Sequence, residues 1–180
     1  MAQYELAQLN IALMKGPIDS ALMADFVANL DRINALAEAS AGYRWRLKTD
    51  DGNATALRPF GDEMLVNLSV WRDVQALRDF VFGPEHLAIM QQRRQWFEKM
   101  PQAYMVLWWV PAGVAPTVEH AKAALDHLRT RGPTPRAFTF RAAFPPPDAA
   151  DNQAAGPTAG ASSTSARLAR RRSRRACRCA

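Results

Sequence analysis

The sequence predicts one α+β domain, and three observations support this prediction. Segments that alternate apolar and polar residues, as strands do, lie between segments whose apolar residues recur every three or four positions, as in helices. Two strand-like segments follow the first helix directly, so the chain begins in the order β-α-β-β-α-β. Hydrophobic residues make up 48% of the chain, enough for an ordinary core. We therefore expect a ferredoxin-like sheet, extended by one further helix and one further strand.

The elements follow one another with turn residues between them. Gly16-Pro17 separates the first strand from a helix that Asp19 or Ser20 can cap. Strand 64–71 is the clearest of all, with apolar residues on both faces. In chain order, the patterns predict strand 4–13, helix 19–39, strands 43–48 and 64–71, helices 74–82 and 85–99, strand 104–110, helix 118–130 and strand 136–144.

The second half of the domain is divided by residues that stop helices and strands. Asp73 can cap helix 74–82, and Gly83-Pro84 interrupts it before the chain continues as helix 85–99. Residues 104–110 are apolar on both faces, which predicts a central strand covered on both sides. The prolines at 145–147 end the last strand.

The predicted sheet raises the question of what covers its second face. A β-α-β-β-α-β arrangement places its helices on one face, and the other face needs apolar cover. A second copy of the same sheet is the simplest cover, so we expect a homodimer, a dimeric α/β barrel with an interior pocket.

The positive charge of the chain is confined to its C-terminal end. The whole chain has a formal charge of +6, but residues 1–150 contain 16 basic and 16 acidic residues. Residues 151–180 hold seven arginines and one acid. We therefore expect a folded domain over residues 1–148 and a disordered Ala/Ser/Arg-rich tail over residues 149–180. Nucleic acid is an unlikely partner except through this tail.

Compartment and metal chemistry are constrained by what the sequence lacks. No apolar run is long enough to span a membrane, and the N-terminus lacks the pattern of a secretory signal. The only cysteines are Cys177 and Cys179, so the domain has no disulfide and no cysteine-based metal site. We expect a cytoplasmic protein that is not bound to membranes and has no metal-ligating residues.

Several segments resemble a known bacterial family. LVNLSVW (65–71), LWWVPAGVAPT (107–117) and GPTPRAFTF (132–140) are similar to the domain of unknown function 3291, and the resemblance covers about residues 3–147. That family is grouped with the dimeric α/β-barrel superfamily, which includes cofactor-free antibiotic-biosynthesis monooxygenases and haem-binding relatives. The resemblance therefore implies this fold and leaves the activity open.

His86 and Arg93 are the first candidates for chemistry. Both lie on one stripe of helix 85–99, whose other members are apolar. Inside a pocket, His86 is a candidate base or haem ligand, and Arg93 could bind an anionic group of a substrate. The alternative is structural: His86 caps the restarted helix or binds a nearby carbonyl group.

Strand residues supply the remaining candidates. Asn67 and Ser69 share one face of strand 64–71, and Asn10 is a similar amide on the first strand. Such groups could hold a carbonyl or enolate oxygen, or could instead satisfy strand ends. Trp71 and Trp108 could line a pocket for a planar ligand, or belong to the core or a dimer interface.

From these observations and from the family resemblance, we expect a monooxygenase-like oxidoreductase that binds an apolar, aromatic small molecule in a barrel pocket. We expect His86 and Asn67 to be catalytic, and Arg93, Ser69, Trp71, Trp108 and Asn10 to bind the substrate. No cofactor is expected, with haem as the alternative. The competing hypothesis is a non-catalytic protein that binds a small molecule or haem.

Overall fold

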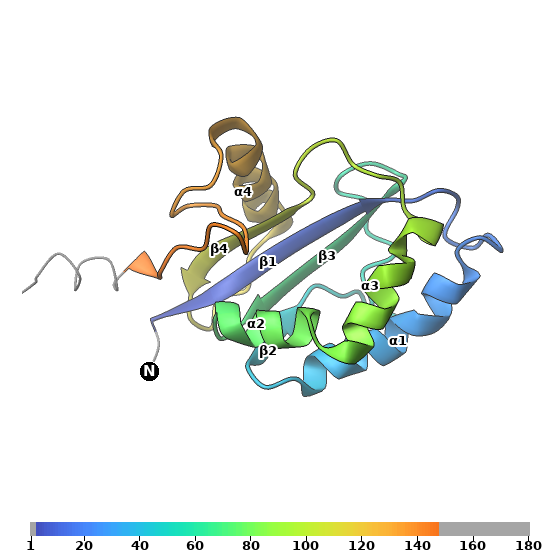
Figure 1. Cartoon of the computed structure of the whole chain (residues 1–180), viewed down its shortest axis with the longest axis horizontal. Coiled ribbons are helices and arrows are strands. Elements are labelled where there is room, and N and C mark those ends of the chain that lie inside the picture. Colours follow the sequence, from blue (N-terminus) through green and yellow to red (C-terminus); the bar gives the residue numbers. More distant parts are fainter. Residues whose placement is uncertain (1–2, 148–180) are drawn as a thin grey trace, which may run out of the picture.

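The computed structural model describes residues 3–147, which form a four-stranded sheet and four helices (Figure 1). The strands are β1 (Tyr4–Leu13), β2 (Tyr43–Arg46), β3 (Met64–Trp71) and β4 (Met105–Pro111). The helices are α1 (Ala24–Ala39), α2 (Val74–Val81), α3 (Pro84–Trp96) and α4 (Val118–Arg131). The predicted tail 149–180 lies outside the described residues.

The order of the strands identifies the fold. The sheet runs β2-β3-β1-β4, and each neighbouring pair is antiparallel. Strand β3 therefore lies between β1 and β2, and β1 lies between β3 and β4, so two split β-α-β units share one sheet. This is the ferredoxin-like α+β arrangement, and it confirms the predicted fold class.

The two faces of the sheet have different helices. Helices α1, α2 and α3 lie on one face, which we call the cavity face (Figure 1). Helix α4 packs on the opposite face through four buried residues. These are Ala121, Ala124, Leu125 and Leu128.

The second face of the sheet is therefore covered within one chain. Leu57 and Phe60, from the segment between β2 and β3, pack against the same apolar cluster as α4. The reason given above for a second copy, an uncovered sheet face, is wrong for this structure. The homodimer itself stays a prediction.

The last predicted strand, 136–144, does not form. Only Phe138 pairs with β4, through two backbone hydrogen bonds to Leu107 of 2.9 and 2.8 Å. Short turns at Thr134–Ala137 and Thr139–Ala142 use the neighbouring backbone groups locally and reverse the chain on either side. The segment still supplies apolar cover, because the Phe138 side chain is fully buried.

Capping residues explain where the helices begin. The Asp73 carboxylate accepts a hydrogen bond of 2.8 Å from the Ala76 amide, as expected for the start of α2. Helix α1 begins later than predicted because the Ser20 hydroxyl bonds back to the Pro17 carbonyl at 2.6 Å and caps no helical amide. No helix in residues 3–147 is long and apolar enough to cross a membrane.

Candidate functional site

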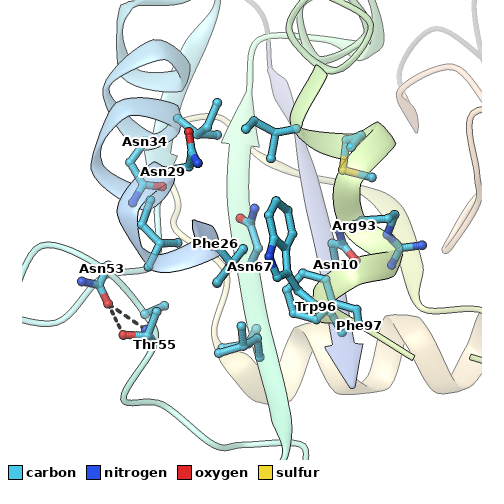
Figure 2. Close-up of a pocket in the computed structure, with 18 of the residues that line it drawn as sticks. Asn10, Phe26, Asn29, Asn34, Asn53, Thr55, Asn67, Arg93, Trp96 and Phe97 are labelled. Carbon is cyan, nitrogen blue, oxygen red and sulfur yellow. Dashed lines mark hydrogen bonds between the residues drawn. The ribbon is translucent and has the colours of Figure 1, made fainter. Parts of the chain in front are cut away.

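A cavity of about 170 Å³ lies between the sheet and helices α1 and α3 (Figure 2). It is therefore inside one chain, on the cavity face, and does not lie between two facing sheets. Its floor comes from β1 and β3, its walls from α1 and α3, and its rim from the residues around the end of β2. The lining residues are Asn10, Ala12, Phe26, Asn29, Leu30, Ile33, Asn34, Arg46, Leu47, Asn53, Ala54, Thr55, Leu65, Val66, Asn67, His86, Ile89, Met90, Arg93, Trp96 and Phe97.

Small and polar side chains on the strands leave this space open. Asn10, Ala12 and Asn67 stand where large apolar side chains would fill the gap beneath the helices. Helix α1 consequently has a single buried residue, Ala37, although its inner stripe is apolar. One end of the cavity is closed by an aromatic cluster, in which the Phe26 ring centroid lies 5.7 Å from that of Trp96 and 5.0 Å from that of Phe97.

Asn10 and Asn67 form a pair of carboxamides on the floor. They are directly opposite each other in the β1–β3 register, so their Cβ atoms are about 5 Å apart. The Asn10 Oδ1 atom is buried and has no hydrogen-bond partner among the described residues. The Asn67 side chain is exposed in a strand where Val66 and Leu68 are buried, and Figure 2 shows it between the two helices. The floor therefore offers hydrogen-bonding groups that the protein itself does not use.

Replacing Asn10 by leucine is expected to stabilise the protein. A buried carbonyl oxygen without a partner costs about 1–3 kcal/mol, and the leucine side chain would remove that cost and add apolar contacts. We expect the free energy of unfolding in urea to rise by about 1–2 kcal/mol. Asn67→Leu is the control, with a smaller change because its amide is solvated. A loss of stability in Asn10→Leu would show that its oxygen is satisfied in the native state.

His86 is held at one wall in a defined tautomer. Its Nδ1 lies 3.0 Å from the Val81 carbonyl oxygen, which can only accept, so Nδ1 carries the proton. Nε2 of the neutral ring is then an acceptor, left for a ligand or for solvent. The ring also packs against Phe80, at 4.6 Å between centroids. Burial lowers the pKa of His86 below its ordinary value of 6.5, and the bond to Val81 only partly offsets this.

The lowered pKa of His86 predicts how stability changes with pH. In the unfolded chain His86 takes up a proton near pH 6.5, whereas the folded protein keeps it neutral to lower pH. The stabilisation that His86 provides in its neutral form is therefore present in full above pH 6.5 and is lost as the pH falls. We expect the unfolding free energy of the wild type, relative to His86→Gln, to drop by at most about 1.4 kcal/mol per pH unit below pH 6.5. Urea titrations of the wild type and of His86→Gln, from about pH 7.5 to about 5, would test this. The same dependence of the unfolding free energy on pH in both proteins would contradict it.

Arg93 and Arg46 are the two cations of the lining, and their surroundings differ. The Arg46 Nε atom binds Glu38 at 2.9 Å, and its Nη2 donates to the Gly52 carbonyl at 2.7 Å. The Arg93 guanidinium instead lies over the Tyr104 ring at 4.8 Å and donates to its hydroxyl at 3.3 Å. No ion pair of Arg93 occurs within residues 3–147, and the described lining contains no Asp or Glu. The cavity therefore has one uncompensated positive charge.

Four predicted site residues thus share the cavity: His86, Arg93, Asn67 and Asn10. Ser69 and Trp71 do not line it. They are buried behind it, where the Trp71 Nε1 donates to the Ser69 hydroxyl and that hydroxyl donates to Gln8 Oε1, both at 2.9 Å. The Trp71 ring stacks on Phe80, with centroids 5.0 Å apart, so it supports the ring against which His86 packs.

Trp108 lies on the opposite face of the sheet from the cavity. Strand alternation turns it toward α4, where it is buried in the apolar cluster of that face. Its neighbour Trp109 points to the cavity face, but its Nε1 donates to the Phe144 carbonyl at 2.9 Å and it does not reach the cavity. Neither tryptophan of the LWWVPAG segment therefore contacts a ligand in this cavity.

The sequence reasoning missed three further asparagines in the lining. Asn29 and Asn34 interrupt the apolar stripe of α1, which is the signal that could have revealed them. Asn53 comes from the loop after β2, where its Oδ1 accepts from the Thr55 backbone amide at 2.9 Å, and only the fold brings it to the cavity (Figure 2). Within residues 3–147, no three His, Cys, Asp or Glu side chains gather as a metal site.

Comparisons with solved structures find matches of low similarity. The cofactor-independent oxygenase SnoaB from Streptomyces nogalater is 19% identical, with a TM-score of 0.40, over 63% of this chain and 96% of that chain. A protein of unknown function from Nitrosomonas europaea is 20% identical, with a TM-score of 0.40, over 64% and 95%. A dabb family protein with a ferredoxin-like fold from Mesorhizobium loti is 18% identical, with a TM-score of 0.39, over 61% and 99%.

These likenesses concern the fold, and the assignment of this fold rests on the strand order of the chain itself. No curated protein matches the sequence. A family model does match it, over residues 5–154, which include all four helices and all four strands except Tyr4, the first residue of β1. The chain therefore belongs to the family described as Domain of unknown function (DUF3291).

Proposed function

We propose that the cavity is the active site of a cofactor-independent oxygenase that acts on an electron-rich aromatic molecule. The observation that carries this proposal is the neutral His86, whose Nε2 is free to accept a proton in a cavity that also holds the Asn10–Asn67 pair. A base and an anchor for a negatively charged oxygen are the two groups that such a reaction requires from a protein.

Each residue has a separate role in the proposed reaction. His86 Nε2 removes a proton from the substrate, and the Asn67 amide stabilises the oxygen on which negative charge develops. Arg93 orients an anionic substrate group. The deprotonated substrate then reacts with O2. One oxygen atom becomes a carbonyl group of the product, and the other leaves as water with two hydrogens from the substrate, so the substrate supplies all the electrons.

The size of the cavity favours this form of the proposal over one with haem. His86 has the donor set of a haem ligand, since Nδ1–H donates to a carbonyl and Nε2 is free. However, a cavity of about 150 Å³ suits a single benzene ring, and a porphyrin is several times larger than the space of about 170 Å³ found here. The proposed reaction therefore does not use haem.

Two measurements on the purified full chain test the proposal. Oxygen uptake with a hydroquinone substrate should be faster than in the buffer control, and it should fall in His86→Ala. A haemin titration should give no Soret band that depends on His86. Absence of oxygen uptake with every electron-rich aromatic tested would overturn the oxygenase and leave a binding protein, whereas a band lost in His86→Ala would establish the haem form.

The homodimer is part of the proposal in a modified form. Since each chain contains a whole cavity and covers both faces of its sheet, a second copy is not required for chemistry. We propose that dimer formation, where it occurs, leaves activity per chain unchanged. Sedimentation together with activity across protein concentrations tests this, because activity per chain that follows the dimer fraction would contradict it.

A further inference from the structure

We infer that the ligand of this cavity is a single-ring hydroxyaryl carboxylate, a benzene ring that bears both a hydroxyl and a carboxylate group. This inference rests on the proposed function only because both concern the same cavity. The ligand inferred here carries a charge, whereas the sequence predicted an apolar one. It follows from three features of the lining: an unpartnered acceptor, an unpaired cation and a small apolar space.

The hydroxyl group follows from acceptors that have no protein donor. Asn10 Oδ1 is buried without a partner, and no described residue donates to His86 Nε2. A buried acceptor without a partner, such as Asn10 Oδ1, is rare in native structures unless a ligand or water supplies the donor. An apolar ring would leave this oxygen unsatisfied, whereas an aromatic hydroxyl can donate to it. Because Asn67 and Asn10 face each other across the strands, the second amide can contact the same oxygen.

The carboxylate follows from the imbalance between the two arginines. Glu38 neutralises Arg46 at 2.9 Å, but the charge of Arg93 meets only the ring and hydroxyl of Tyr104. The guanidinium keeps donors that Tyr104 does not take up, and guanidinium groups match the two oxygens of a carboxylate. With no acid in the described lining, an anionic ligand is attracted to this site and a cationic one is not.

The single ring follows from the volume and the walls. The cavity of about 170 Å³ is close to the size that accommodates one benzene ring. Its walls carry Leu30, Ile33, Ile89 and Met90, which provide apolar contacts to both faces of a flat ligand.

Calorimetric titration of the full chain with three small probes tests this inference. Gentisate, a dihydroxybenzoate, has both groups, benzoate has the charge alone, and hydroquinone has the hydroxyls alone. Titrations without oxygen prevent turnover and oxidation of the probes. We expect gentisate to bind at least tenfold more tightly than either other probe. Its affinity should also fall as NaCl is raised from about 50 to about 500 mM, whereas that of hydroquinone should not.

Two variants assign the groups to their partners. Arg93→Gln should weaken gentisate binding at least tenfold and leave hydroquinone within twofold. Arg94→Gln is the matched control, since the neighbouring Arg94 is exposed on the same helix and does not line the cavity. Asn10→Leu should bring gentisate and benzoate to equal affinity. If Arg93→Gln fails to fold, the dependence of gentisate affinity on NaCl in the wild type still shows whether charge contributes to binding.

The outcomes separate this inference from the proposed function. Equal affinities for the three probes, no binding of gentisate, or an unchanged gentisate affinity in Arg93→Gln would each overturn the ligand class. Gentisate binding in the expected pattern without any oxygen uptake would overturn the oxygenase and leave the ligand class standing. Oxygen uptake with neutral hydroquinone, combined with no gentisate binding, would overturn the ligand class and leave the oxygenase standing.

Discussion

His86→Gln is expected to lower the rate of oxygen uptake by a factor of about 10² to 10⁴, the usual contribution of a general base. Glutamine keeps a polar side chain in the space beside Phe80 and Val81, but it cannot take up a proton near neutral pH. The wild-type rate should rise with pH and reach a plateau, with a midpoint below 6.5, because burial lowers the pKa of His86. The initial rates of oxygen consumption at low substrate concentration give both quantities, because they follow kcat/KM and therefore report the pKa of the ligand-free protein.

His120→Gln is the matched control for this experiment. His120 is exposed on α4, on the opposite face of the sheet, and does not line the cavity, so its rate and pH profile should equal those of the wild type. An unchanged rate in His86→Gln would remove His86 as the base. A reduced rate with an unchanged pH profile would mean that His86 acts by position rather than by accepting a proton.

Leu125→Ala is expected to lower the free energy of unfolding by about 2–5 kcal/mol, the usual range when a buried leucine side chain is truncated to alanine. Leu125 is fully buried at the centre of α4, against the second face of the sheet.

Leu87→Ala, on the exposed side of α3, provides the comparison. Its side chain is 40% exposed, so its loss should stay within about 1 kcal/mol. If Leu125→Ala were as mild as Leu87→Ala, α4 would not be packed on the sheet in solution.

The fold was predictable because its signals are local. Strands β1 and β3 have the boundaries predicted from alternation alone, and Asp73 caps α2 as its residue type suggests. The predictions that failed concern local hydrogen bonds that compete with one another. Residue types alone do not tell which of the competing bonds forms. Ser20 bonds to the Pro17 carbonyl rather than to a helical amide, and the turn at Thr139–Ala142 reverses a segment whose aromatic spacing is typical of a strand.

The site was only partly predictable, because a cavity is a property of several elements at once. His86 and Arg93 stood out as polar members of an apolar stripe, and both line the cavity. Ser69 looked equivalent to Asn67 on the same face of β3. It lies behind the cavity, where it is buried and its hydroxyl is bonded to Gln8 and Trp71.

The α+β class, the order of elements and the polar residues within apolar stripes could be predicted from the sequence, since these depend on periodicity along the chain. The tertiary structure was needed to show that α4 covers the second face of the sheet and that the cavity lies inside one chain. It also decided which amides remain without partners, Asn10 above all. The physical reason is that hydrogen-bond satisfaction and free volume depend on how separate elements pack, and residue spacing does not encode that packing.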